Sequence, residues 1–266
     1  MRIRLLSVVI TSAVVALCGC SATTGSTPAS HRQNVAATAP PPPSHRVAPA
    51  PARPPAAAAS PAVASKPAPM LQLGDHGHSV AVLQRRLSAL GYWLGPANGR
   101  FGDTTQQAVY AFQKVAGLTR DGVVGPKTAA ALASGAQPSA RTHSGHVIEV
   151  NLRKDLVMIV NNGTVSAVLN TSTGGGYTYT SRGVTSVANT PTGRFQIERT
   201  VNGMDISPLG QMWRPRYFYS GYALHGDTYV PPYPVSHGCV RVSNDAIDWI
   251  WATNQAPIGT EVYVYY

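Results

Sequence analysis

The spacing of hydrophobic positions changes along the chain and divides it into segments of different character. Leu5 to Leu17 is a predominantly apolar run, and from Ser21 to Pro69 large apolar residues almost disappear. Between residues 71 and 133, apolar residues recur every three or four positions, as on one face of an amphipathic helix. From residue 146 onward they fall in short β-rich runs bounded by turn residues. The pattern predicts a helical unit followed by a mainly β unit.

Three helices are expected in the first unit. Ser79 is a candidate N-cap of the first helix and Asp103 of the second, and Pro126 suits the first turn of the third. The turn at 98–102 (Asn-Gly-Arg-Phe-Gly) recurs 23 residues later at 121–125 (Asp-Gly-Val-Val-Gly), and each copy leads into a helix. The unit is therefore expected to repeat one turn–helix pattern. The apolar face of its first helix comprises Val80, Leu83, Leu87 and Leu90.

The second unit is expected to consist mainly of strands. Asn162-Gly163 is a strong hairpin signal, and Ser243 can cap a short helix. Residues 171–183 are rich in Gly, Ser, Thr and Tyr, which predicts a mobile loop, and the small, polar residues 135–145 predict a short linker between the units. The expected strands are Val147–Val150, Leu156–Val160, Thr164–Leu169, Phe195–Glu198 and Glu261–Tyr266.

The charge of the chain is unevenly distributed. Charged residues make up only 12 % of the 266 residues, and the formal net charge is +10. All 11 acidic residues lie from Asp75 onward, but six of the basic ones precede it, so the expected folded part has an excess of only four positive charges. This weak excess suits an anionic wall polymer at least as well as a nucleic acid. Because no basic cluster carries interleaved aromatic residues, no nucleic-acid partner is expected.

The first 20 residues have the pattern of an export signal. Arg2 and Arg4 precede the apolar run, which is too short to span a bilayer stably. The run ends in Leu17-Cys18-Gly19-Cys20, which resembles a bacterial lipobox with Cys20 as the lipidated residue; an ordinary secretory signal cut near Ala22 is the alternative. Residues 21–69, rich in Pro and Ala, are expected to be a disordered linker. The resulting prediction is an extracytoplasmic lipoprotein anchored to a membrane.

The number of cysteines leaves Cys239 as the free thiol of the expected mature protein. If Cys18 leaves with the signal and Cys20 is acylated, Cys239 is the only thiol that remains. A single leftover cysteine in an exported protein is either paired with another molecule or reactive. The alternative is a buried, inert thiol that packs as a small hydrophobe. The neighbours of Cys239 favour a reactive thiol.

Those neighbours are Ser236-His237-Gly238-Cys239-Val240-Arg241, and His225-Gly226 ends an apolar run upstream. A thiol nucleophile needs a base and donors for the oxyanion that it creates. The residues alone leave His225 and His237 as rival bases, and the amides of Gly238 and Cys239 can form an oxyanion hole. Arg241 is expected either to bind a substrate carboxylate or to form an internal ion pair. Ser236 is expected to fix the loop.

Residues 70–134 resemble the three-helix peptidoglycan-binding domain of bacterial wall enzymes. This resemblance implies a binding role, and the domain is therefore expected to act as a tether, leaving a fragment of residues 140–266 active on soluble peptides. His76 and His78 have no companion ligands at metal-binding spacing, so no metal site is expected. The matching segments are Leu83-Gln84-Arg85-Arg86-Leu87, Leu90-Gly91-Tyr92, Gly99-Arg100-Phe101-Gly102, Ala108-Val109-Tyr110-Ala111-Phe112-Gln113 and Asp121-Gly122-Val123-Val124-Gly125.

Residues 146–266 resemble the L,D-transpeptidase catalytic domain of the YkuD type. The resemblance implies a β-sandwich-like fold with one or two short helices, Cys239 as the nucleophile and His225 as the base. It makes His237 a supporting residue and the Gly226 carbonyl the partner of the His225 ring, and it calls for no cofactor. The matching segments are Ser172-Thr173-Gly174, Thr190-Pro191-Thr192-Gly193-Arg194-Phe195, His225-Gly226 and the Ser236–Arg241 hexapeptide.

The predicted function is cross-linking of peptidoglycan stem peptides. Cys239 is expected to cleave the L,D bond of a stem tetrapeptide and transfer the acyl group to an amine. An L,D-carboxypeptidase and a transferase that attaches a wall protein are alternatives of the same fold. A wall-binding lipoprotein without catalysis is a third alternative. The loop at 227–235 is shorter than in many relatives and contains Pro231, Pro232 and Pro234, so the shape of the substrate site is not predicted.

Overall fold

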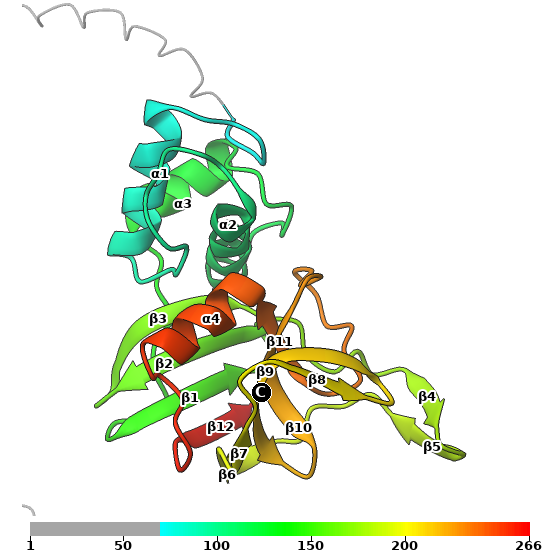
Figure 1. Cartoon of the computed structure of the whole chain (residues 1–266). Helices are drawn as coiled ribbons and strands as arrows, with labels where there is room; N and C mark the ends of the chain where they lie inside the picture. The colour runs from blue at the N-terminus through cyan, green and yellow to red at the C-terminus, as the bar shows by residue number, and fades with distance from the viewer. Residues whose placement is uncertain (1–69) are drawn as a thin grey trace, which may run out of the picture. The chain divides into compact units, whose positions relative to one another are not determined.

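The computed structural model of this chain describes residues 70–266. The predicted export signal, the lipidation of Cys20 and the linker at 21–69 lie outside these described residues. The three-helix unit and the mainly β unit follow one another in the order expected (Figure 1), so the predicted fold class is confirmed. Within residues 70–266, no helix has the length and apolar character needed to cross a bilayer.

The helical unit contains α1 (His78–Ala89), α2 (Asp103–Ala116) and α3 (Pro126–Ser134). Pro126 occupies the first turn of α3, as predicted. The predicted caps of the other two helices are wrong by one or two residues, because Gly77 and Gly102 are the N-caps and Ser79 and Asp103 lie inside the first turns. Neither of these glycines has a side chain that could bind the free amides of the first turn.

The repeated turns are each held by a buried glutamine. The side-chain amide of Gln84 donates to Asn98 Oδ1 (3.1 Å) and to the Arg100 carbonyl (2.9 Å), and its oxygen accepts from the Gly99 amide at 2.8 Å. Gln113 makes the equivalent bonds in the second copy, to Asp121 Oδ1, the Val123 carbonyl and the Gly122 amide. The sequence repeat is therefore a structural repeat, in which one buried amide replaces the missing backbone partners of a turn.

The β unit is built from two five-stranded sheets. The first has the order β3–β2–β1–β12–β6, in which β1 and β12 are parallel. The second has the order β11–β10–β9–β7, with β8 also paired to β9, and β10 and β11 are parallel. A separate hairpin, β4 with β5, completes the strands. Their bounds are β1 His146–Asn151, β2 Leu156–Asn161, β3 Thr164–Asn170, β4 Thr178–Ser181, β5 Val184–Val187, β6 Gly193–Gln196, β7 Arg199–Thr200, β8 Met204–Ser207, β9 Gly210–Tyr219, β10 Tyr222–Asp227, β11 Val240–Ser243 and β12 Glu261–Tyr265.

Strand β2 is buried on both faces because it separates two cores. Val157 and Ile159 point to one side, into a core shared with β10, β11 and helix α4 (Asn244–Ala252). Leu156, Met158 and Val160 alternate with them and pack against the three helices of the first unit. Since successive strand residues point to opposite faces, one short strand connects the sandwich core with the helical core.

One segment differs from its prediction, and the predicted linker has contacts that the sequence did not indicate. Residues 171–183 do not form one loop: Ser172 and Gly174 bridge to Arg241 and Ser236, and the chain then enters the β4–β5 hairpin. Residues 135–145 are a linker with fixed contacts. The Tyr92 hydroxyl donates to the Ala136 carbonyl at 2.8 Å. At the other end of the linker, the buried carboxylate of Glu149 accepts from the amides of residues 141 and 142, from the Thr142 hydroxyl and from the Tyr265 hydroxyl.

Candidate active site

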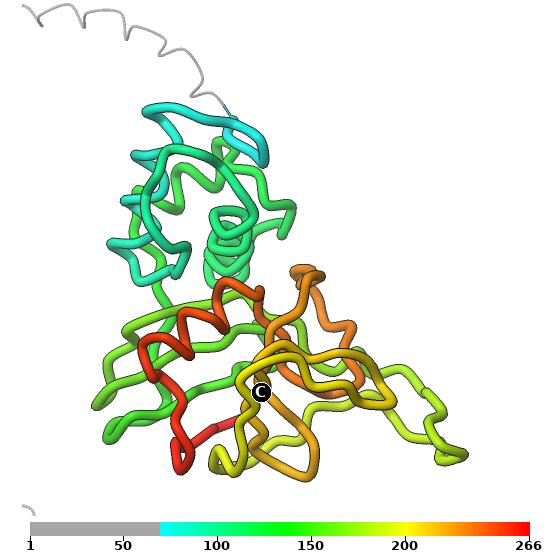
Figure 2. Tube along the Cα trace, in the orientation of Figure 1, coloured from blue at the N-terminus to red at the C-terminus, as the bar shows by residue number. Residues whose placement is uncertain are grey.

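The thiol and the first histidine lie on neighbouring parallel strands. In the register of β10 and β11, Leu224 pairs with Val240 and His225 with Arg241. Cys239 comes directly before β11, at the end of the turn that begins at Ser236. The long connection between the two strands can be followed as the orange part of the chain in Figure 2. The pairing of the two strands therefore brings Cys239 near His225, although the two residues are 14 positions apart in the sequence.

Hydrogen bonds to backbone groups fix the turn that carries Cys239. The Ser236 hydroxyl donates to the Cys239 carbonyl (2.6 Å) and accepts from the Gly238 amide (3.0 Å). The Thr190 hydroxyl donates to the Gly238 carbonyl at 2.7 Å. Ser236 thus takes the loop-fixing role expected from the sequence. The Gly238 amide, which is expected to act as an oxyanion donor, is therefore already bonded to Ser236 in this conformation.

Gly238 has a conformational requirement that only glycine meets easily. Its φ angle is +138°, and an added Cβ would lie 2.5 Å from a ring carbon of Tyr222 and 2.7 Å from the Asn189 carbonyl oxygen. Backbone at that distance cannot yield as a flexible side chain would. The approach of the turn to the segment around Asn189 therefore depends on the missing side chain.

His225 is buried, with 3 % of its surface exposed, and its ring has a defined orientation. Nδ1 lies 2.8 Å from the Gly226 carbonyl oxygen, which can only accept, so Nδ1 carries the proton in the neutral ring. Nε2 is then the unprotonated nitrogen. Burial lowers the pKa of His225, against an opposing effect of the Gly226 carbonyl and Asp227. The structure therefore favours a neutral imidazole with a basic Nε2.

Cys239 is half-buried, and its sulfur lies 3.9 Å from the Gly221 carbonyl oxygen. Burial raises the pKa of the thiol, although the Ala223 amide and the positive charge of Arg241 act in the opposite direction. Both shifts, at Cys239 and at His225, favour the neutral forms. The resting pair is therefore a thiol and an imidazole, and formation of the thiolate has to accompany proton transfer.

His237 lies beside two tyrosines of the segment that leads into the β4–β5 hairpin. Its ring packs edge-to-face against Tyr177, with 5.7 Å between ring centroids, and against Tyr179, with 4.7 Å. Burial and the Arg241 charge lower the pKa of His237. These contacts give His237 a role in holding the hairpin, so the sequence alternative in which it competes as the base receives no support from its surroundings.

Arg241 has features of both roles expected from the sequence, an internal ion pair and a binding group for a carboxylate. Its Nε lies 3.2 Å from Asp227 Oδ2, and both side chains are about four-fifths buried. An internal ion pair is thus present. Arg241 also lines the same cleft as Cys239 and His225. It can hold Asp227 and still present positive charge to a ligand.

The cleft itself has a volume of about 540 Å³ and is bounded by two hairpins. The β4–β5 hairpin contributes Tyr179 and Arg182, and the β8–β9 hairpin contributes residues 205–212. Ile206 at the β8–β9 hairpin is 74 % exposed. None of these lining residues was predicted from the sequence. The glycines on either side of β8, Gly203 and Gly210, were the signal that could have marked the second hairpin.

Fold and site together define a two-part protein in which a β-sandwich carries a thiol and an imidazole in one cleft. Residues 145–264 match the family of L,D-transpeptidase catalytic domains, and residues 76–132 match a peptidoglycan binding domain. A crystal structure of an L,D-transpeptidase from Xylanimonas cellulosilytica is 50 % identical, with a TM-score of 0.73, and the alignment covers 76 % of this chain and all of that one. The chain belongs to the L,D-transpeptidase family.

The chain also matches N-acetylmuramoyl-L-alanine amidases over short stretches. A stretch of 53 residues is 43 % identical to the N-acetylmuramoyl-L-alanine amidase CwlM of Mycobacterium tuberculosis and covers 20 % of this chain and 13 % of that protein. A probable N-acetylmuramoyl-L-alanine amidase of Bacillus licheniformis is 45 % identical over 73 residues, or 27 % of this chain and 20 % of the amidase. The chain thus spans a small part of these relatives.

Proposed function

We propose that this protein is a cell-wall L,D-transpeptidase in which Cys239 is the nucleophile and His225 the general base. The observation that carries the proposal is the His225 ring: its Nδ1 is held by the Gly226 carbonyl, and its Nε2 is free to accept a proton. The same cleft contains the Cys239 thiol. Family membership supports the reaction type, and the ring orientation supports the division of roles.

In the first half-reaction, the Cys239 sulfur attacks the carbonyl carbon of the third residue of a stem tetrapeptide. The thiol proton passes to Nε2 of His225. The bond between this carbonyl and the nitrogen of the terminal D-alanine then breaks, and His225 returns the proton to the leaving amine. The products are free D-alanine and a thioester on Cys239. His225 is neutral again, as it must be for the next step.

In the second half-reaction, an amine of another stem peptide attacks the thioester carbonyl. The side-chain amine of diaminopimelate is the expected acceptor. It gives a proton to His225 as the new amide bond forms, and the proton restores the Cys239 thiol. Attack by water in place of the amine would make the enzyme an L,D-carboxypeptidase.

Negative charge on the tetrahedral intermediates requires hydrogen-bond donors. We assign this role first to the Cys239 amide, because the Gly238 amide already donates to Ser236. Gly238 would contribute as a donor only after that bond exchanges. Arg241 supplies positive charge for a carboxylate of the stem peptide, while its Nε remains against Asp227.

The binding partner proposed for the helical unit is peptidoglycan, as its match to a peptidoglycan binding domain supports. Lipidation of Cys20 would anchor the protein to a membrane on the extracytoplasmic side, within reach of the wall. A mass measurement of the mature N-terminus tests this part separately: the expected result is an S-diacylglyceryl group on Cys20, with or without an acyl group on its α-amine, and an unmodified N-terminus near Ala22 would contradict it.

The reaction is tested by incubating the wild-type protein and Cys239→Ser with a soluble stem tetrapeptide. Release of D-alanine with formation of a cross-linked dimer is expected for the wild type alone. Release of D-alanine without the dimer would assign the protein as a carboxypeptidase. Equal turnover by Cys239→Ser would exclude the thiol mechanism, because a hydroxyl is far less acidic than a thiol.

A further inference from the structure

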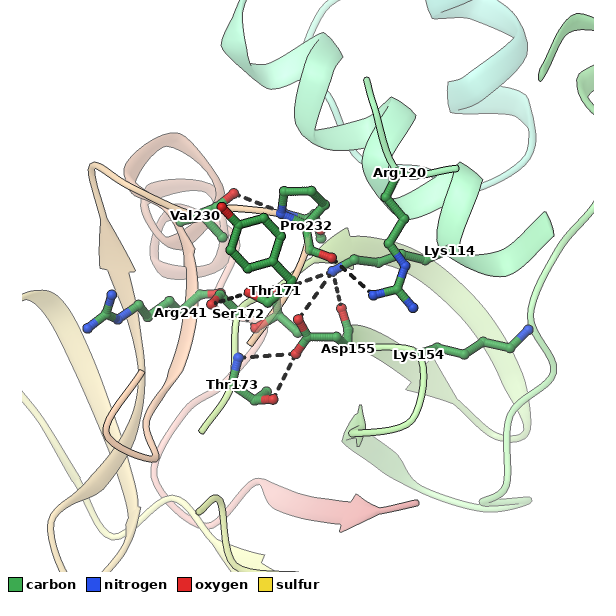
Figure 3. A network of polar contacts seen from close by, with 12 residues as sticks. Lys114, Arg120, Lys154, Asp155, Thr171, Ser172, Thr173, Val230, Pro232 and Arg241 are labelled. Atoms are coloured by element: carbon green, nitrogen blue, oxygen red, sulfur yellow. Dashed lines mark hydrogen bonds and ion pairs between the residues drawn. The ribbon is translucent and has the colours of Figure 1, made fainter. Parts of the chain in front are cut away.

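A lysine of the helical unit reaches deep into the β unit. Lys114, near the end of α2, has a fully buried side chain. Its ammonium donates to the carbonyls of Asp155 (2.7 Å) and Thr171 (2.8 Å), and it lies 3.5 Å from the Asp155 carboxylate. Figure 3 shows the ammonium at the centre of this group. Its three protons therefore have three partners, all from the β unit.

Asp155 connects Lys114 with residues 171–173, the segment that follows β3. It lies in the turn between β1 and β2 with a φ angle of +57°, an unusual conformation for a residue other than glycine. Its Oδ1 accepts from the amide (3.1 Å) and the hydroxyl (2.8 Å) of Thr173. Lys114 and Asp155 together thus hold Thr171 and Thr173 from one side.

From the other side, the same segment is bonded to the residues around Cys239. The Thr171 hydroxyl donates to the Arg241 carbonyl at 2.6 Å, and the amide of Arg241 donates to the Ser172 carbonyl at 3.0 Å. The Ser236 amide donates to the Thr173 carbonyl at 2.9 Å. Both ends of the catalytic hexapeptide, Ser236 and Arg241, are therefore paired with the segment that Lys114 holds.

Two further side chains of the helical unit support the loop between β10 and β11. The Arg120 guanidinium donates to the Pro232 carbonyl at 3.1 Å. The Gln107 amide donates to the Val230 carbonyl at 3.1 Å. This loop joins His225 to the turn of Cys239. The helical unit consequently contacts both connections on which the relative position of base and nucleophile depends.

We propose that Lys114 is a positioning residue for the Cys239 turn, and that the helical unit is a structural part of the active site as well as a wall-binding module. The proposal rests on the acyl-transfer function proposed above. Burial of an ion pair contributes little net stability by itself, so stability alone does not account for Lys114. Its two carbonyl contacts, in contrast, define where the 171–173 backbone lies.

The proposal is tested by the rate at which Cys239 of the full chain is acylated by a soluble stem tetrapeptide, measured in a single turnover by intact mass. Lys114→Met should slow acylation by up to about 10²-fold, the cost of a small misplacement of reacting groups. Thr171→Val, which keeps the side-chain volume and loses the bond to Arg241, should slow it by about tenfold. The substrate concentration for half-maximal rate should change little in both.

Lys154→Met is the matched control. Lys154 is the neighbour of Asp155 and donates to the Val115 carbonyl of α2 at 3.1 Å, so it crosses the same interface without touching the 171–173 segment. Acylation at the wild-type rate is expected for this variant. An equal slowing by Lys154→Met would show that any weakening of the interface slows the reaction, and would overturn the specific role of Lys114.

A double variant separates positioning from stability. Lys114→Met/Asp155→Asn removes both charges and should recover much of the melting temperature lost by Lys114→Met, but acylation should stay slow. Full recovery of the rate would overturn the proposal, as would wild-type rates in both Lys114→Met and Thr171→Val. If Lys114→Met does not fold, Thr171→Val decides alone. Absence of any adduct on the wild-type protein would instead refute the proposed function.

Discussion

The orientation of single side chains determines what the catalytic pair can do. Because the Gly226 carbonyl fixes the proton on Nδ1 of His225, Nε2 is the nitrogen available as a base. Burial acts in opposite directions on the two pKa values, lowering that of His225 and raising that of Cys239, and both effects disfavour charge. In the proposed mechanism, the pair therefore starts neutral and becomes charged only as the thiol attacks.

His225→Ala should slow acylation by roughly 10² to 10⁴, the usual contribution of general acid–base assistance. His237→Asn should have a smaller effect. The His237 ring packs against Tyr177 and Tyr179, whereas the His225 ring is oriented by a hydrogen bond to a backbone carbonyl. Single-turnover acylation of the two variants is the measurement. A larger loss for His237→Asn would exchange the two roles.

The acid limb of the pH profile should lie below the ordinary histidine value. Since burial lowers the pKa of His225 below 6.5, the neutral base persists as the pH falls past 6.5 and is lost only at the lower, folded-state pKa. The acylation rate at low substrate concentration should therefore still exceed half of its plateau at pH 6.5 and halve at a more acidic value. A half-maximal rate above pH 6.5 would contradict the assignment of a buried, neutral His225.

At this scale, the sequence indicated the proposed reactive residues more readily than their partners. Cys239 comes from a contiguous motif, whereas the family resemblance decided between His225 and His237 and named the Gly226 carbonyl as the partner of the His225 ring. The Asp227 partner of Arg241 and the occupied Gly238 amide could not be predicted, because both depend on how the connection between β10 and β11 folds back. Lys114 gave no signal, since a lysine on a helix is normally exposed.

Among the elements, the β4–β5 hairpin forms part of the wall of the cleft that contains Cys239 and His225. Tyr179 packs its ring against His237 and lines the cleft. Residues 171–183 were predicted as a mobile loop because their polar, glycine-rich composition lacks an apolar alternation. The bridges to Ser236 and Arg241 order the first part of this segment, and such long-range pairing is invisible in local composition.

Tyr179→Ala should loosen this hairpin, since an aromatic pair contributes about 0.5–1.5 kcal/mol beyond its buried area. Faster hydrogen exchange at residues 178–187 and a severalfold higher substrate concentration for half-maximal acylation are expected. Tyr179→Phe is the control, because it keeps the ring and loses only the hydroxyl. The role of the hairpin would be refuted if Tyr179→Ala and the wild-type protein behaved alike in both measurements.

Other elements show why some strands were predicted and others not. Leu156–Val160 is a continuous apolar run, which indicated a strand, and the structure shows that the missing alternation reflects burial on both faces. Strands β8 and β9 were missed. β8 has no buried residue, and β9 carries Arg214, Pro215 and Arg216 in its centre, a sequence that resembles a loop more than a strand.

In residues 70–266, side chains of the β unit and of the helical unit pack together in one of the hydrophobic cores. Leu156, Met158, Val160 and Val168 of the β unit are each at most 1 % exposed and pack with the helices. The linker at 135–145 is bonded at both ends. From these contacts we infer, in place of the tether-only expectation from the sequence, that the helical unit also supports the fold of residues 140–266.

A fragment of residues 140–266 should therefore be unstable, and it should be inactive even toward a soluble substrate. Exposing these four buried apolar side chains costs roughly 1.5–3 kcal/mol each. The summed cost is comparable with the roughly 5–15 kcal/mol stability of an ordinary domain. Loss of cooperative thermal unfolding and of acylation is expected. A fragment of residues 70–266 is the matched control and should keep both; wild-type behaviour of the shorter fragment would restore the tether interpretation.

The most direct test of the whole account is to locate the acyl group on the protein. After incubation with a stem tetrapeptide and rapid acid quenching, proteolysis and mass spectrometry should find the tetrapeptide, less its terminal D-alanine, as a thioester on the peptide that contains Cys239. Cys239→Ser should carry no adduct. Release of D-alanine by the wild-type protein with the acyl group on another residue, or with no adduct under conditions that trap thioesters, would contradict the account.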